Sequence, residues 1–131
     1  MKRSVILYTL LCLLLYPPIA YCYDAERAKA NLASDYAECA AYYLLSSEGL
    51  KRAGKDTTMV DEAFKAAYDF AVKISNQEVT EARIKLSLDE QTELQGHDFS
   101  NFAIVIEKYG KFCKDLLEAP EKRLQFWLDK E

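Results

Sequence analysis

Two cysteines constrain the fold of this chain more than any other feature of its sequence. Cys39 lies on the apolar stripe of a predicted helix over residues 24–53, and Cys113 lies on that of a predicted helix that begins near Phe99. If the helices are antiparallel and joined by short loops, both cysteines lie roughly 21 Å from the same end of the bundle, at about 1.5 Å per residue. The sequence therefore predicts a Cys39–Cys113 disulfide between neighbouring helices. Two buried free thiols are the alternative.

Residues 1–22 have the layout of a secretory signal peptide. A positively charged start precedes the apolar run SVILYTLLCLLLYPPIA, and the small residues Ala20 and Cys22 occupy positions −3 and −1 before Tyr23. Cleavage before Tyr23 would give a secreted or periplasmic protein in an oxidising compartment, where disulfides form and persist. Cleavage after Ala20 instead would leave Cys22 as an unpaired thiol.

Two other fates of this N-terminal segment stay open. An uncleaved membrane anchor is disfavoured, because Pro17 and Pro18 cut the apolar run below the roughly 20 residues that a spanning helix needs. Lipidation of Cys22 is the other alternative, and Tyr21 before this cysteine fits it poorly.

The rest of the chain, residues 23–131, is short enough to be a single domain. Loss of residues 1–22 removes two positive charges and no negative ones, so the formal charge falls from −4 to −6. An acidic domain repels phosphate backbones and anionic lipid surfaces. We therefore expect no nucleic-acid partner and, after cleavage, no membrane association.

Apolar residues recur at helical spacing throughout this domain, with little turn chemistry. The segment 78–95 is ambiguous because RIKLSLD alternates apolar and polar residues, but a lone strand would leave its backbone unpaired, so we expect a helix. The predicted fold is all-α: an antiparallel four-helix up-down bundle with a short C-terminal fifth helix from Pro120. In this fold three apolar residues of the last helix pack over the end of the bundle, namely Leu124, Trp127 and Leu128.

Few residues in the chain could carry catalysis. His97 is the only histidine and lies in a Gly-His-Asp turn, and the sequence contains neither a haem attachment motif nor a glycine-rich phosphate loop. We therefore expect no catalytic residue, no metal and no cofactor. Four carboxylates alternate with lysines in the manner of a solvated helix face: Glu38, Glu48, Asp61 and Glu62.

Aromatic residues are the remaining indication of function. Tyr42 lies off the apolar stripe of the first helix, so Tyr42, Leu45 and Trp127 are the best candidates for an interaction patch, with packing at the core boundary as the alternative. The predicted function is that of an exported, disulfide-linked, non-catalytic module that binds another envelope or extracellular protein, or a small apolar ligand between its helices. The alternatives are a periplasmic acid or stress chaperone and an enzyme that uses paired carboxylates.

Overall fold

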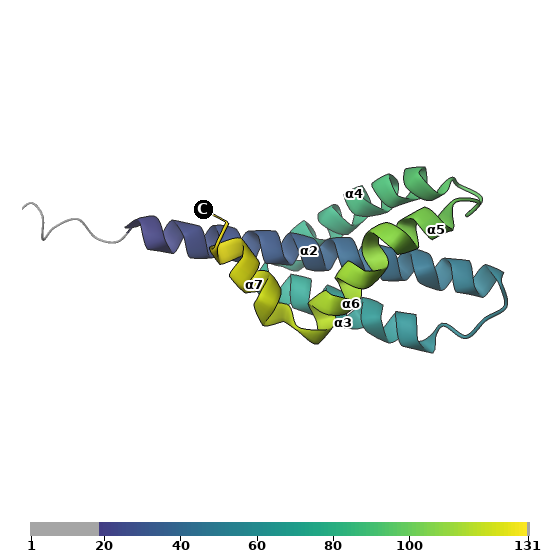
Figure 1. Cartoon of the computed structure of the whole chain (residues 1–131), viewed down its shortest axis with the longest axis horizontal. Coiled ribbons are helices and arrows are strands. Elements are labelled where there is room, and N and C mark those ends of the chain that lie inside the picture. The colour runs from purple at the N-terminus through teal and green to yellow at the C-terminus, as the bar shows by residue number, and fades with distance from the viewer. Residues whose placement is uncertain (1–18, 131) are drawn as a thin grey trace, which may run out of the picture.

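A computed structural model describes residues 19–130 of the chain, with side chains from residue 24 onward. Helices make up 85% of the structure, and the described residues contain no strand, so the all-α prediction is confirmed. No helix in this part of the chain is both long enough and apolar enough to cross a membrane. The elements, shown in Figure 1, are α2 (Ile19–Arg52), α3 (Thr58–Ile74), α4 (Gln77–Gln95), α5 (Phe102–Val105), the π-helical turn η1 (Ile106–Gly110), α6 (Lys111–Glu118) and α7 (Pro120–Leu128).

The long helix α2 is the centre of the molecule, and α3 runs back along it (Figure 1). This close packing follows from small residues: α2 completely buries several alanines, and α3 buries Ala67 and Ala71. Alanine side chains let two helix axes approach closely without a gap between them. The fully buried alanines of α2 are Ala37, Ala40 and Ala41.

The ambiguous third segment is a helix, as predicted. Its first turn is capped by Asn76, whose side chain accepts a hydrogen bond from the backbone nitrogen of Val79 at 2.9 Å. The fully buried Gln91 side chain then joins α4 to α2, because its Nε2 donates to the backbone oxygen of Glu38 at 3.1 Å.

The fourth segment begins at Phe102, so the predicted start near Phe99 is wrong by three residues. The cause is the turn before it, in which Gly96 and Phe99 both have left-handed backbone angles, with φ of 72° and 65°. The helix then passes through the π-helical turn η1, which places Tyr109 in the core. Next to it, Gly110 packs closely on α2, since a Cβ atom there would lie 3.2 Å from the Tyr42 hydroxyl oxygen.

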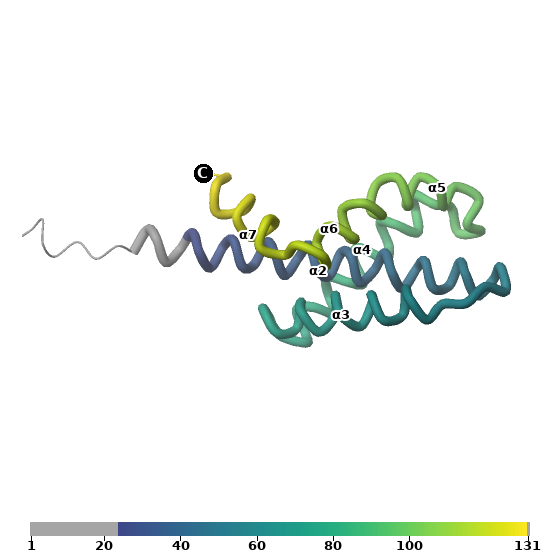
Figure 2. The backbone as a smooth tube through the Cα atoms, turned by 60° about the horizontal axis from the view of Figure 1, so that its bottom comes forward, coloured from purple at the N-terminus to yellow at the C-terminus, as the bar shows by residue number. Residues whose placement is uncertain are grey.

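Helix α7 lies beside the N-terminal half of α2 in both views (Figures 1 and 2). Leu124 and Trp127 are half-buried, as a packing role requires, but Leu128 is 41% exposed. The prediction that Leu128 packs on the core is therefore wrong, because among the described helices α7 packs on α2 and α6 and leaves Leu128 toward solvent. The central position of α2 does not establish a regular up-down bundle, which stays a prediction. Residues 1–18 of the predicted signal peptide lie outside the described residues, and its last four residues, 19–22, belong to the first turn of α2.

Candidate functional site

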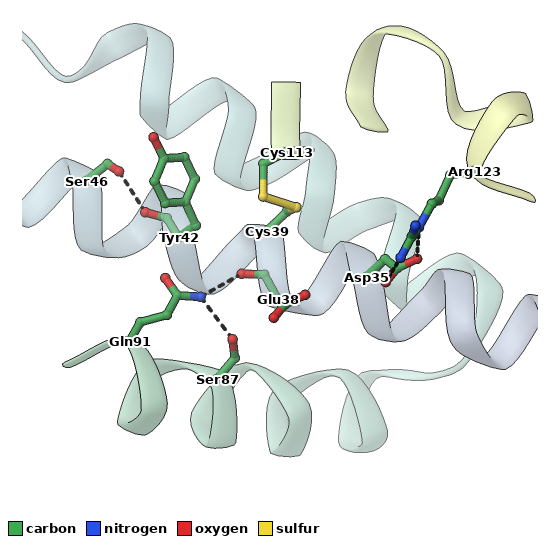
Figure 3. The surroundings of a disulfide bond; sticks show 9 residues. All are labelled: Asp35, Glu38, Cys39, Tyr42, Ser46, Ser87, Gln91, Cys113 and Arg123. Atoms are coloured by element: carbon green, nitrogen blue, oxygen red, sulfur yellow. Dashed lines mark hydrogen bonds and ion pairs between the residues drawn. A yellow bond between two sulfur atoms is a disulfide. The ribbon is translucent and has the colours of Figure 1, made fainter. Parts of the chain in front are cut away.

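The predicted cysteine pair is confirmed. The Cα atoms of Cys39 and Cys113 lie 5.3 Å apart, their sulfur atoms are bonded, and both residues are completely buried (Figure 3). The bond connects the middle of α2 to α6, two segments far apart in the sequence. The fourth segment is thereby held against the central helix.

A polar cluster around Asp35 attaches α7 to α2. The buried Asp35 carboxylate accepts hydrogen bonds from Arg123 Nε at 2.7 Å and Nη2 at 3.1 Å, and from Trp127 Nε1 at 2.6 Å (Figure 3 shows the Arg123 pair). Charge-assisted and bidentate bonds of this kind are the strongest that side chains make. The Arg123 guanidinium also lies over the rings of Phe126 and Trp127, at 4.4 and 4.8 Å from the centroids.

An apolar groove of about 460 Å³ opens where the start of α7 meets α2 and α3. We call it the α2–α3–α7 groove. The ring of Phe70 stacks on that of Tyr36, with the centroids 5.2 Å apart and the planes at 21°, yet Phe70 remains 42% exposed. A large aromatic side chain is thus held rigidly on one side and open to solvent on the other. The residues that line the groove are Lys29, Leu32, Tyr36, Phe70, Lys73, Ile74, Pro120 and Leu124.

A second groove, of about 480 Å³, lies between α6 and α7. Phe112 and Phe126 line it together with charges of both signs. Among these charges, Lys111 pairs with Asp115 and Arg123 pairs with Asp35. The charged side chains of this groove are thus of both signs, whereas those of the α2–α3–α7 groove are both lysines.

The carboxyl group of Glu38 is half-buried, so the interpretation of Glu38 as part of a solvated helix face is wrong. Burial, and then the negative charges of Asp35 and Glu90, raise its pKa. The pKa of Glu90 itself is lowered, first by its hydrogen bond from Lys108 at 2.9 Å. Glu38 and Glu90 line one small polar pocket with Arg83, whose Nη1 is buried and has no hydrogen-bond partner among the described residues.

This pocket bears on the hypothesis of a carboxylate enzyme. Two carboxylates with raised pKa values in one cleft would favour it, and here the pKa of Glu38 is raised while that of Glu90 is lowered. His97 is exposed, and its Nε2 atom lies 3.7 Å from Oε1 of Glu93. No three His, Cys, Asp or Glu side chains of residues 24–130 come together in a way that could hold a metal ion.

The predicted interaction patch does not appear as one exposed surface. Leu45 is buried, at 8% exposure, because it belongs to the apolar face of α2. Tyr42 is half-buried, and its ring lies 5.2 Å from that of Tyr43 and 6.4 Å from that of Tyr109. The indole nitrogen of Trp127 is bonded within the Asp35 cluster.

Sequence reasoning missed the α2–α3–α7 groove, although one signal for it was present. Phe70 lies beside the apolar stripe that Phe64, Ala67, Ala71 and Ile74 form at helical spacing, and a large aromatic residue off such a stripe is expected to be partly exposed. Comparisons with family models, with curated proteins and with solved structures find no match to this chain. Its function is therefore inferred from the geometry of its own residues.

Proposed function

We propose that this chain is an exported, non-catalytic binding protein, and that the α2–α3–α7 groove holds a small apolar ligand. The observation that carries the proposal is the half-exposed Phe70 ring, stacked on Tyr36 above an apolar floor. Concave, mostly apolar sites of about 300–1,000 Å³ with a few polar groups at the margin are typical of small-molecule sites. The groove volume of about 460 Å³ lies within this range.

The residues of the groove favour binding over catalysis. Its lining contains no histidine, cysteine, serine or carboxylate. Burial, followed by the charge of Glu121, raises the pKa of the Tyr36 hydroxyl, which keeps this group protonated and therefore a poor base. Such a lining can bind a ligand through apolar contacts, and none of its side chains is suited to exchange a proton with that ligand.

Export remains part of this proposal. It is supported by the signal-like residues 1–22 and by the buried Cys39–Cys113 pair, which suits an oxidising compartment. On this proposal residues 23–131 form one secreted or periplasmic domain, arranged as an up-down bundle around α2. An envelope or extracellular protein that contributes an apolar side chain to the groove would be an alternative occupant.

The test of the binding function uses 1-decanol, an uncharged apolar probe, titrated into the oxidised protein and followed by NMR. We expect saturable shifts at α3 residues around Phe70, and a loss of affinity of at least tenfold in Phe70→Ser. Ile104→Ser is the control, because Ile104 is similarly exposed, at 48%, and lines neither groove. Equal affinity in the two variants, or shifts that never saturate, would contradict the proposed site.

A second candidate function, an acid or stress chaperone, is favoured by two polar contacts between helices. Asp61 of α3 accepts a hydrogen bond from Ser47 of α2 at 2.6 Å, and Glu90 of α4 pairs with Lys108 of η1. Hydrogen bonds lower the pKa of both carboxylates, so their contribution to stability is lost as the pH falls through the lowered pKa. A chaperone of this kind would bind an apolar dye and suppress aggregation of a client protein near pH 3 but not at pH 7.

A further inference from the structure

The charges that line the α2–α3–α7 groove have one sign. Lys29 and Lys73 are both positive, whereas the chain as a whole is acidic, with a formal charge of −4. Lys73 makes no ion pair among the described residues. Lys29 pairs only with Glu26, at 3.1 Å, and both side chains are largely exposed, so solvent screens this pair. The groove therefore presents local positive charge that an anionic group could approach.

Both lysines lie at the same end of the groove. The stacked rings of Tyr36 and Phe70 set the level at which α2 and α3 face each other. Because α3 runs antiparallel to α2 (Figure 1), residues before Tyr36 lie beside residues after Phe70. Lys29 is thus displaced by roughly 10 Å and Lys73 by roughly 5 Å in the same direction, at about 1.5 Å per residue. One end of the groove is aromatic and the other is cationic.

A carboxylate lies near the aromatic pair. The charge of Glu121 contributes, after burial, to the raised pKa of the Tyr36 hydroxyl. Leu32 and Ile74 supply apolar walls, and at about 1.5 Å per residue both lie roughly 6 Å from the ring pair, between the levels of Lys73 and Lys29. Both positive charges therefore lie on one side of the aromatic rings, with aliphatic side chains between them.

We infer that the ligand of the α2–α3–α7 groove is a free single-chain amphiphile with an anionic carboxylate head, bound with its head between Lys29 and Lys73 and its hydrocarbon chain along Leu32 and the Tyr36–Phe70 pair. This inference rests on the proposed function and specifies its ligand class. A monomeric amphiphile, in preference to a lipid in a bilayer, follows from the net acidic surface, which anionic membranes repel.

The test compares probes that share a ten-carbon chain: decanoate, 1-decanol and decyltrimethylammonium, each kept below its micelle concentration. At low salt we expect decanoate to bind the oxidised protein about tenfold more tightly than 1-decanol, and the cationic probe to bind more weakly than 1-decanol. Shortening decanoate to octanoate removes two methylenes and should weaken binding by about fifteenfold, since burial of each methylene contributes about fourfold in affinity.

The matched variants are Lys73→Gln in the groove and Lys65→Gln on the same helix outside it. Lys73→Gln should remove most of the preference for decanoate and leave the affinity for 1-decanol unchanged, whereas Lys65→Gln should change neither. Raising the salt concentration to about 0.5 M should reduce the difference in affinity between decanoate and 1-decanol in the wild-type protein.

The outcomes separate this inference from the proposed function. Saturable binding of 1-decanol that is sensitive to Phe70→Ser, without a preference for decanoate, overturns the anionic ligand and leaves the binding function standing. No saturable binding of any ten-carbon probe overturns both. Binding to phosphatidylglycerol vesicles without binding to monomeric decanoate also overturns the inference, because it identifies a membrane surface as the target.

Discussion

Removal of the Cys39–Cys113 bond should strongly destabilise the fold. The bond joins residues separated by 74 positions. In the chain-entropy model a loop of this length restricts the unfolded chain by roughly 4 kcal/mol. Small domains unfold with only about 5–15 kcal/mol in total, so the bond is a large part of the stability of this one.

The assay is urea denaturation followed by circular dichroism at 222 nm. Three samples are compared: the oxidised protein, the reduced protein, and the double variant Cys39→Ala with Cys113→Ala. Reduction breaks the bond but keeps both sulfur atoms in place, whereas the double variant also empties their fully buried positions. We expect the reduced protein to lose about 4 kcal/mol of unfolding free energy, and the melting temperature to fall by about 15–25 °C. The double variant should be less stable still, because it adds a cavity.

Two results would refute this reasoning. A reduced protein within about 1 kcal/mol of the oxidised one would show that the bond does not restrict the unfolded chain. A double variant as stable as the oxidised protein would show the same without the use of a reductant. The denaturant slope provides a check, since the unlinked chain should expose more surface on unfolding and give a steeper slope.

Two further predictions concern the polar contacts of α2. Trp127→Phe removes the indole donor to the Asp35 carboxylate and should lower the unfolding free energy by about 1–3 kcal/mol in the same urea assay. Glu38→Gln should raise stability at pH 7 by no more than about 1 kcal/mol, because this carboxyl group is only half-buried and solvent screens it. The folded pKa of Glu38 is raised, so the wild-type protein loses stability as the pH rises through the raised pKa; the advantage of the variant should therefore vanish at acidic pH. An advantage that grows as the pH falls would contradict this sign.

The helices and the cysteine pair could be predicted because both follow from local spacing. The prediction compared the distance of each cysteine from the same end of the bundle, and both helix ends used for it were slightly wrong. Helix α2 ends at Arg52 instead of near Ala53, and the fourth segment starts at Phe102 instead of near Phe99, so both errors shorten these distances. The two errors differ by two residues, which shifts one cysteine relative to the other by only about 3 Å along the helix axes. The pairing therefore survived errors in both helix ends.

The Asp35 cluster could not be predicted, because its partners are remote in the sequence. Arg123 and Trp127 follow Asp35 by 88 and 92 residues, and an aspartate within a helix usually lies on a solvated face. The left-handed Phe99 is a second case, since residues other than glycine rarely adopt such a backbone and no local pattern announces it. Helical periodicity encodes neither the long-range contacts of Asp35 nor the backbone angle of Phe99.

The Asp35 cluster also accounts for the open groove. Apolar side chains alone would let α7 slide until its contacts with α2 and α3 closed, because hydrophobic burial is not directional. The three hydrogen bonds to Asp35 instead fix the position and angle of α7 through specific atoms of Arg123 and Trp127. With α7 held there, Leu124 borders the groove and leaves Phe70 uncovered. On the proposed binding function, a groove that is open before a ligand arrives avoids the energetic cost of reorganisation on binding.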